Sequence, residues 1–399
     1  MNKVLKYVVQ AVVLLVLAVV MVVLFKARLD VLNAEKAAAE EQEAAAAMAA
    51  QATPTPNAEA TPEPTPEPTP EPQPEYFTIS CIGDCTLWSS VQFENSNVGL
   101  PKVVGDNYAY PFSNTVQYFK DDEYTLANLE CTFSDKKLYS NQMFYFCAPT
   151  AYANIMTEGG VDFVTTANNH TMDFGDEGVK STLATLDAIG LPYGTERQAQ
   201  IVTTKNGLKL GIYTAGNDMR PDWKTDEAVA AVQSLREQGA DYVICMFHWG
   251  EEKFYTPNTN QTTLAHAVAD AGADLIYASH PHCLQPIEEY NSTLILYSLG
   301  NWVFGGHTAP SDPDTAIIQV KLKRDLDGSV TTDGYDIIPC CVSSNLEGAA
   351  KKADNYNTYC PTPYEEGSEA YQRVLSKLDG SFTPTSQGAD YSNWYASYS

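Results

Sequence analysis

Residues 274–290, "DLIYASHPHCLQPIEEY", end a short apolar run with two histidines that flank Pro281. The apolar run predicts a strand, and the histidines stand where that strand should give way to a loop. Two interpretations of His280 and His282 follow. They are incidental loop residues, or they are half of a metal site whose other ligands lie far away in the sequence.

The same arrangement recurs at four earlier segments. Each apolar run is followed at once by a carboxylate, amide or imidazole: "YFTISCIGD" ends in Asp84, "YTLANLE" in Glu130, "VDFVTTANNH" in Asn169 and His170, and "DYVICMFHWG" in His248. Ligands gather at the carboxyl ends of strands in open α/β sheets, so five such segments can present these groups to one cleft. Oxygen and nitrogen donors without thiolate favour Mn, Fe, Zn or a similar divalent ion.

Each of these positions has a plainer interpretation when it is taken alone. A Gly-Asp pair after a strand is often a turn, Glu130 could cap a helix, and a single loop histidine is usually ordinary polar loop chemistry. Four of the six histidines nevertheless fall at such strand ends, which favours a metal site. His266, within a predicted helix, and His307, in a glycine-rich loop without a matching strand, are not expected on the metal.

The composition indicates a folded chain with an acidic surface. Its 399 residues are 44% hydrophobic, and 24 Lys and Arg against 50 Asp and Glu leave a formal net charge of -26. This charge argues against nucleic acid or anionic lipid as a partner through bulk electrostatics. The nine cysteines include no CxxC pair and indicate no disulfide framework. Cys81 with Cys85, or Cys360 with Cys340 or Cys341, could still pair in an oxidising compartment.

The N-terminal region predicts a membrane anchor. Residues 7–25, "YVVQAVVLLVLAVVMVVLF", would span roughly 28 Å as a helix. We predict an uncleaved transmembrane anchor over residues 1–30, because no small-x-small cleavage site follows the apolar run directly. A cleaved signal peptide is the alternative. Residues 31–75, rich in Ala and Glu and then in a Thr-Pro-Glu-Pro repeat, predict a stalk and an extended linker. The downstream domain is expected outside the cytoplasm, at the cell membrane.

Residues 76–345 alternate short apolar strands with amphipathic helices, which is typical of the α/β class. One helix is predicted before Gly190 from regularly spaced apolar residues, and another over about residues 262–271. The apolar positions of the first helix are Val179, Leu183, Leu186 and Ile189. Residues 346–399 show little periodicity, so they form either a peripheral extension of the domain or a partly disordered tail.

In order and spacing these segments resemble the CapA family, bacterial capsule or poly-γ-glutamate synthesis proteins whose PGA_cap domain is related to calcineurin-like metallophosphoesterases. The resemblance covers roughly residues 77–310. The matching elements are "GDCTLW" (83–88), "NLECTFS" (128–134), "ANNHTMDFGDEGVKSTLATLDAIGLPYGT" (167–195), "HWGEE" (248–252), "ADAGADLIYASHPHCLQPIEEY" (269–290) and "YSLGNWVFG" (297–305). The resemblance implies a four-layer α/β/β/α sandwich with a metal cleft at the strand ends.

The resemblance also implies a role for each residue of the cleft. Glu130 is expected to bridge two ions, with His280 and His282 divided between them. His170 resembles the catalytic, non-ligand histidine that stabilises charge on a phosphate or protonates the leaving oxygen. Thr86 stands where these phosphoesterases have a histidine ligand, so one or two ions are implied. The implied metal ligands are Asp84, Glu130, Asn169, His248, His280 and His282.

Two hypotheses about function follow. The first is a membrane-anchored, extracytoplasmic protein of capsule or poly-γ-glutamate synthesis or export, with a metal-dependent hydrolase site that cleaves a phosphoester. The second is a noncatalytic component that binds the polymer or membrane synthase subunits and keeps the fold and a structural metal. An acidic chain is poorly suited to gripping polyglutamate over a broad surface. Arg220 and Lys224 are candidates for a local cationic patch, or are ordinary surface charges.

Overall fold

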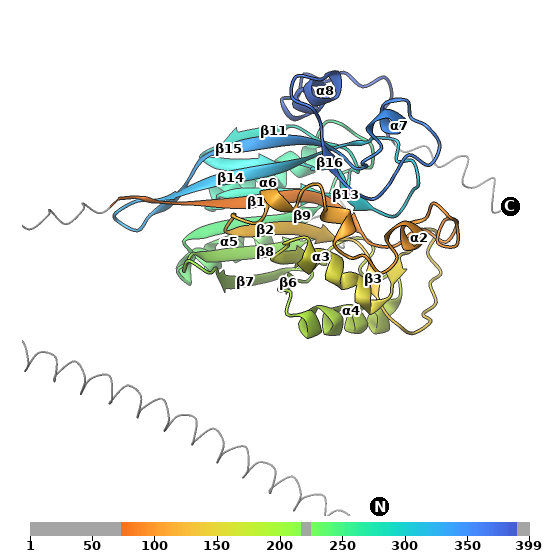
Figure 1. Ribbon diagram of the computed structural model, residues 1–399. Helices are drawn as coiled ribbons and strands as arrows, with labels where there is room; N and C mark the ends of the chain where they lie inside the picture. Colours follow the sequence, from red (N-terminus) through yellow and green to blue (C-terminus); the bar gives the residue numbers. More distant parts are fainter. Residues whose placement is uncertain (1–72, 217–224, 389–399) are drawn as a thin grey trace, which may run out of the picture. The chain divides into compact units, whose positions relative to one another are not determined.

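Two β-sheets lie face to face in the computed structural model, which describes residues 73–216 and 225–388 (Figure 1). The first sheet has the order β16-β15-β14-β1-β2-β5-β6, with β13 beside β1. Strands β13, β1, β2, β5 and β6 run parallel, whereas β14, β15 and β16 pair antiparallel. Their bounds are β1 Glu75–Thr86, β2 Tyr124–Leu129, β5 Phe163–Thr165, β6 Tyr193–Gly194, β13 Asn301–Phe304, β14 Asp314–Arg324, β15 Val330–Cys341 and β16 Thr362–Pro363.

The second sheet has the order β11-β12-β10-β9-β8-β7. Its central strands β8, β9, β10 and β12 are parallel, and an antiparallel strand closes each edge. The bounds are β7 Gln198–Thr203, β8 Lys209–Ala215, β9 Tyr242–His248, β10 Leu275–Ser279, β11 Ile287–Tyr290 and β12 Thr293–Leu296. A separate parallel pair is formed by β3, Thr132–Phe133, and β4, Cys147–Ala148.

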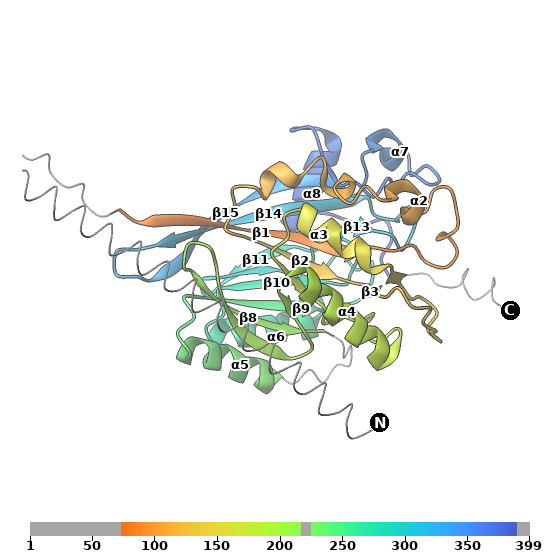
Figure 2. The same cartoon turned by 60° about the horizontal axis from the view of Figure 1, so that its bottom comes forward.

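Helices cover the outer faces of both sheets (Figure 2). The α-helices are α2 Leu100–Val104, α3 Asn154–Glu158, α4 Gly175–Ile189, α5 Thr225–Glu237, α6 Thr259–Asp270, α7 Leu346–Ala350 and α8 Glu369–Leu378. Short 3₁₀ turns occupy Tyr110–Phe112, Val116–Tyr118 and Thr150–Ala153. The predicted α/β class is confirmed.

Three buried clusters account for this layering. Between the sheets, inward-facing residues of both sheets form one cluster, which includes Ile79 of β1 and Ile244 of β9. Outside the first sheet, Leu186 of α4 joins a second cluster. Outside the second sheet, Val232 of α5 and Val268 of α6 join a third. Each sheet is therefore buried on both faces, which explains why its central strands are almost continuously apolar.

Helix α4 ends as predicted, because Gly190 takes the left-handed conformation with φ 69°. Its buried face differs from the predicted one, since Val179 and Leu183 are only half-buried. The structure buries a face of small residues instead, where Thr182 donates to the Gly178 carbonyl and accepts from the backbone N–H of Phe133, both at 3.0 Å. Small side chains allow the helix to approach β3 closely.

Helix α6 begins at Thr259, three residues before the predicted start. Asn258 and Gln261 form a capping box in which each side chain accepts from the backbone N–H of the other. This reciprocal cap satisfies two N–H groups that a helix otherwise leaves unpaired, and it extends the helix by one turn.

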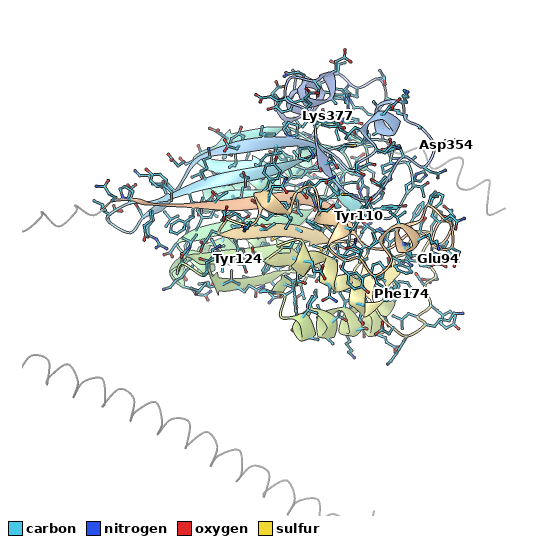
Figure 3. The ribbon with its side chains drawn as sticks, in the orientation of Figure 1. Glu94, Tyr110, Tyr124, Phe174, Asp354 and Lys377 are labelled. Atoms are coloured by element: carbon cyan, nitrogen blue, oxygen red, sulfur yellow. The ribbon has the colours of Figure 1, made fainter. Side chains whose placement is uncertain are left out.

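The C-terminal segment packs on the domain as far as residue 388. Strand β16 pairs with β15, and α8 lies against β14 and β15. Lys377 of α8, labelled in Figure 3, is buried against β14, where its ammonium bonds to Asp312 and Asp314 at 2.7–2.8 Å. Of the two alternatives for this region, the described part is an extension that packs on the sheets.

The predicted anchor lies outside the described residues, as does nearly all of the stalk and linker. Within residues 73–216 and 225–388, no helix has both the length and the apolar content needed to cross a membrane. The nine cysteines all belong to the described part of the chain and are free thiols, most of them buried. None of the suggested cysteine pairs is bonded in this structure.

Candidate metal centre

The predicted site residues meet where the carboxyl ends of β1, β2 and β5 of one sheet approach those of β9 and β10 of the other. Strands β2, β9 and β10 end at or directly before the predicted residues. Strand β5 ends at Thr165, four residues before Asn169, and β1 continues past Asp84 to Thr86, because this end of β1 pairs with β13. A Cβ on Gly83 would lie 2.2 Å from the Gly300 carbonyl oxygen, so glycine is required for this close approach.

Four of the predicted ligands, Glu130, Asn169, His248 and His280, converge on one atom. The Nε2 atom of His248 lies 2.8 Å from Asn169 Oδ1 and 3.1 Å from His280 Nδ1. It also lies 3.4 Å from Glu130 Oε1. Donor atoms from β2, from the loop after β5, from β9 and from the turn after β10 therefore face a common point, as ligands of a single cation do.

The remaining predicted ligands, Asp84 and His282, lie beside each other. His282 Nδ1 is 3.4 Å from Asp84 Oδ2, and the backbone N–H of His280 donates to the same oxygen at 3.3 Å. The potential ligand atoms of Glu130, His280 and His282 all lie within 4.8 Å of one another. Glu130 is thus common to both sets of donors, which matches the bridging position implied for it.

The buried donors fit a divalent cation. The side chains of Glu130, Asp84 and His248 are fully buried. Glu130 Oε1 makes no hydrogen bond with any described residue, although a buried carboxylate oxygen without a partner is costly. Glu130 Oε2, in contrast, accepts from the Thr86 hydroxyl at 3.1 Å. A metal ion would supply the partner that Oε1 lacks, and the set of nitrogen and oxygen donors suits a transition metal.

Electrostatics keep two of the imidazoles neutral, the form that binds metals. Burial and the neighbouring imidazoles lower the pKa of His248 well below its ordinary value and that of His280 to about 4. Burial and the charge of Asp84 raise the pKa of Glu130 to about 7. Burial opposes the charge of His282, but Glu130 and Asp84 raise its pKa to about 10. The cluster thus combines the carboxylates of Glu130 and Asp84 with the imidazole of His282. A bound cation would change the protonation of these groups.

His170, the predicted catalytic histidine, lies beside these donors. Its Nδ1 atom is 2.8 Å from Asp173 Oδ2, and its ring meets that of Phe146 edge-on at 4.8 Å. Burial lowers the pKa of His170, but the bond to Asp173 and the charges of Glu130 and Asp173 together outweigh burial and raise the pKa above its ordinary value. Because Asp173 holds Nδ1, Nε2 is the ring nitrogen left for a molecule in the adjoining cavity.

Two asparagines without a predicted role hold the ligands in place. Asn128 donates to Asp84 Oδ1 at 2.8 Å, and its own oxygen accepts from Asn168 at 3.1 Å. Asn301 Oδ1 lies 2.9 Å from His282 Nδ1. Their signal in the sequence is position: Asn128 begins "NLECTFS" and Asn301 ends "YSLGN", two of the segments that carry the family resemblance.

The turn that carries the two histidines is strained. His280 and His282 have φ angles of 101° and 53°, a region that residues with a side chain rarely occupy. The carbonyl of Pro281 between them accepts from the backbone N–H of Lys253 at 2.7 Å, and Lys253 itself has φ 60°. Strain of this kind concentrates at functional sites, where the surrounding structure imposes it.

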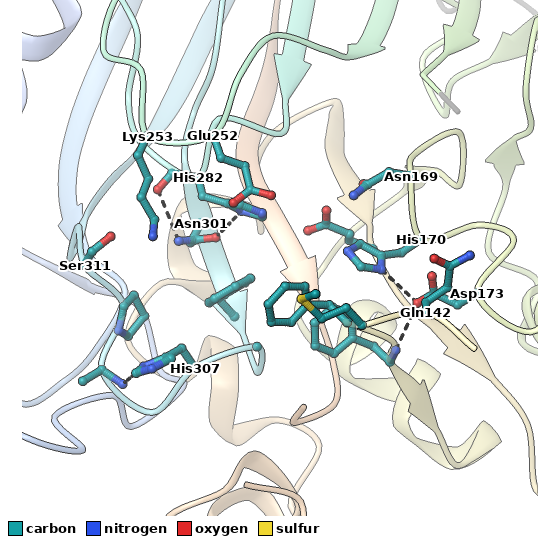
Figure 4. A pocket seen from close by; sticks show the side chains of 18 residues that line it. Gln142, Asn169, His170, Asp173, Glu252, Lys253, His282, Asn301, His307 and Ser311 are labelled. Carbon is teal, nitrogen blue, oxygen red and sulfur yellow. Dashed lines mark hydrogen bonds and ion pairs between the residues drawn. The ribbon is translucent and has the colours of Figure 1, made fainter. Parts of the chain in front are cut away.

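The donors open into a cavity of about 430 Å³ (Figure 4). Its lining includes Glu130, Asn169, His170 and His282 on one side and the aromatic rings of Phe144, Phe146 and Phe304 on another. The remaining polar groups are Gln142, Asp173, Glu252, Lys253, Asn301, His307 and Ser311.

The two histidines not expected on the metal lie apart from the donor cluster. His266 pairs with Glu288 at 3.0 Å and stacks on Tyr290 at 3.9 Å, away from the cavity. His307 lines the cavity, and its Nδ1 accepts from the backbone N–H of Ala309. Arg220 and Lys224, the candidate cationic patch, lie outside the described residues.

Comparisons with known proteins find a matching family and similar proteins. Residues 78–306, more than half of the chain, match the family described as bacterial capsule synthesis protein PGA_cap. The PGA biosynthesis protein CapA of Bacillus subtilis is 32% identical over 240 residues, which cover 55% of this chain and 63% of that protein. The capsule biosynthesis protein CapA of Bacillus anthracis is 29% identical over 276 residues, or 62% and 64%. The chain thus aligns with less than two thirds of the length of either relative.

Among solved structures, NAD nucleotidase of Haemophilus influenzae is 14% identical, with a TM-score of 0.41 over 82% of this chain and 67% of that one. This score is below 0.5, so the family assignment rests on the sequence match.

Proposed function

The chain belongs to the PGA_cap family of bacterial capsule synthesis proteins, and we propose that it acts in capsule or poly-γ-glutamate synthesis or export as a metal-dependent phosphoester hydrolase. The observation that carries the proposal is Glu130 Oε1, a buried oxygen without a hydrogen-bond partner among the described residues, to which three imidazoles and a second carboxylate lie close. The apolar run at residues 7–25 supports a membrane anchor with the domain outside the cytoplasm.

Each part of the site has a task in this proposal. A bound divalent ion would lower the pKa of a coordinated water and polarise a phosphoryl oxygen. His170, held by Asp173 at Nδ1, presents Nε2 to stabilise charge on the phosphate or to protonate the leaving oxygen. Phe146 and Phe304 exclude water from one wall of the cavity. The one or two ions would be held by Asp84, Glu130, Asn169, His248, His280 and His282.

One observation favours a second candidate function, that of a noncatalytic polymer- or partner-binding component. Thr86 replaces a histidine ligand, and its hydroxyl donates to Glu130 Oε2 at 3.1 Å. That oxygen is already satisfied by the protein, and one nitrogen donor is absent from the Asp84 side of the site. A single ion with a structural role is consistent with this arrangement.

Metal content and hydrolysis measured on the full chain separate the two candidates. We expect the wild type to bind Mn²⁺ or Zn²⁺ and to hydrolyse bis(p-nitrophenyl) phosphate. His280→Ala should lose the metal, whereas His170→Ala should keep it and hydrolyse roughly 100-fold more slowly, the usual contribution of one general acid. The matched control is His266→Ala, because His266 pairs with Glu288 away from the cavity. A wild type that holds metal but cleaves neither phosphodiesters nor phosphomonoesters would reject the hydrolase and support the noncatalytic component.

A further inference from the structure

One cation on the cavity wall has no assigned partner. Lys253 is half-buried, and its ammonium forms no hydrogen bond or ion pair with any residue of the described ranges. In Figure 4 its side chain extends into the cavity between Ser311 and Asn301. It is the single lysine or arginine among the described residues that line this cavity.

The backbone fixes this cation relative to the metal donors. The Lys253 N–H donates to the Pro281 carbonyl at 2.7 Å, so it is tied to the turn that carries His280 and His282. On its other side, the Lys253 carbonyl accepts from the Gly388 N–H at 3.0 Å. Lys253 keeps its unfavourable φ of 60° between these two bonds. The side chain therefore starts from an anchored position rather than from a free loop.

The surroundings of Lys253 suit part of a ligand that extends beyond the metal donors. A cavity of about 430 Å³ is larger than a single phosphate requires and falls within the range of small-molecule sites. Burial lowers the pKa of His307, and the charge of Lys253 lowers it further, so this charge acts on the cavity wall. A half-buried charge is screened less by salt than one on the surface.

We propose that Lys253 forms an anion subsite, which binds a second anionic group of the substrate next to the group held at the metal donors. That first group comes from the proposed function, on which this inference rests. An ammonium offers three donors and a point charge, which suit a carboxylate or a phosphate oxygen. The substrate class is then an anionic chain, with glutamyl carboxylates or polyol phosphates as the two sources of the second anion.

The acidic composition of the chain opposes binding of a polyanion, and a local cation would reduce this repulsion. A net charge of -26 repels a polyanion over most of the surface. An anionic chain would bind where this repulsion is locally reversed, and Lys253 together with a cation held by the metal donors would provide one such place. The subsite also distinguishes anionic chains from neutral esters that could otherwise reach the metal.

Calorimetric titration of the Mn²⁺-loaded full chain tests the subsite without requiring turnover. The probes are tri-γ-glutamate, 1,3-propanediol bisphosphate and inorganic phosphate, the last of which carries only one anionic group. We expect Lys253→Met to weaken at least one of the two longer probes by roughly tenfold or more, the scale of one charge-assisted hydrogen bond, and to leave inorganic phosphate within about twofold. Lys253→Arg should retain most of the affinity.

The outcomes distinguish a carboxylate from a phosphate as the second anion, and they show whether the subsite exists. A loss confined to tri-γ-glutamate assigns a carboxylate, and a loss confined to the bisphosphate assigns a phosphate. The matched control is Lys209→Met, which removes an exposed charge at the amino end of β8, the opposite edge of the sheet. Equal affinities of Lys253→Met and wild type for both longer probes would overturn the subsite, as would an equal loss for inorganic phosphate.

Failure of hydrolysis has a different signature from failure of the subsite. Lysine-dependent binding without turnover rejects the hydrolase and keeps the subsite. Turnover with lysine-independent binding rejects the subsite alone. Since lysine and methionine both carry a Cβ, Lys253→Met leaves the backbone strain unchanged, and unaltered metal content and melting temperature would show that the variant folds.

Discussion

Replacement of Lys377 by methionine should strongly destabilise the domain. Lys377 is 3% exposed on α8 and donates to both oxygens of Asp312 at 2.7 Å and to Asp314 Oδ2 at 2.8 Å. Arg373 also binds Asp314, through two bonds of 2.7 Å. When Lys377 is removed, Asp314 therefore keeps one cation, but Asp312 loses its cation while it remains buried.

The magnitude follows from that uncompensated carboxylate. Breaking a buried ion pair by removing one partner costs about 3–5 kcal/mol, so we expect Lys377→Met to lower the free energy of unfolding by that amount. The double variant Asp312→Asn with Lys377→Met should recover about 1–2 kcal/mol, because the buried charge is then absent. Lys351→Met, which removes an exposed partner of Glu347, is the control and should cost less than about 0.5 kcal/mol.

The pKa shifts of Asp314 and Lys377 set the direction in which the free energy of unfolding changes with pH. The bonds from Arg373 and the charge of Lys377 outweigh burial and lower the pKa of Asp314, so its stabilisation is present above its unfolded pKa and is lost as the pH falls through the folded one. Burial opposes the charge of Lys377, but the two aspartates raise its pKa. Its contribution is complete below its unfolded pKa and is lost as the pH rises through the folded value. Both contributions are therefore present at neutral pH.

Urea denaturation of the full chain, followed by tryptophan fluorescence at pH 4, 7 and 9, measures these differences. The loss in Lys377→Met should be largest at pH 7 and 9, where both contributions are present, and smaller at pH 4, as the pH approaches the lowered pKa of Asp314. A loss below about 1 kcal/mol at pH 7, or one that does not change with pH, would refute the reasoning that a buried, unpaired carboxylate is responsible.

Three further changes test the metal centre. Thr86→Val removes the donor to Glu130 Oε2, so we expect the metal-free protein to lose about 1–3 kcal/mol in urea denaturation, and an unchanged stability would contradict the importance of this bond. Gly83→Ala would place a Cβ 2.2 Å from the Gly300 carbonyl oxygen and displace Asp84, so the melting temperature and the Mn²⁺ content should both fall. The control is Gly328→Ala at an exposed position, where the added Cβ meets no atom within 4 Å, and it should leave the metal content unchanged. Adding Mn²⁺ to chelator-treated protein at about 100 times its Kd should stabilise it by about 2.7 kcal/mol, and a melting temperature insensitive to both Mn²⁺ and Zn²⁺ would argue against the site.

The amino-acid sequence by itself determined the fold class and the residues expected at the candidate site. Apolar runs that each end in a carboxylate, amide or imidazole predict parallel strands with ligands at one edge, because the carboxyl ends of parallel strands meet there. The structure places Asp84 and His280 at this edge with a 3.3 Å hydrogen bond, although 196 residues separate them. The end of α4 at Gly190 was equally predictable, since it depends on local backbone preference.

Only the tertiary structure decided how these residues are arranged and which others support them. Asn128, Asn301 and Lys253 carry no periodicity or strand-end signal of their own, and their roles depend on neighbours from distant segments. The packing of α8 is similar, because the pairing of Lys377 with Asp312 spans 65 residues and follows from the position of β14. Local sequence specifies which groups a strand presents at its end. The partners of those groups are set by sheet pairing and by burial, which involve the whole chain at once.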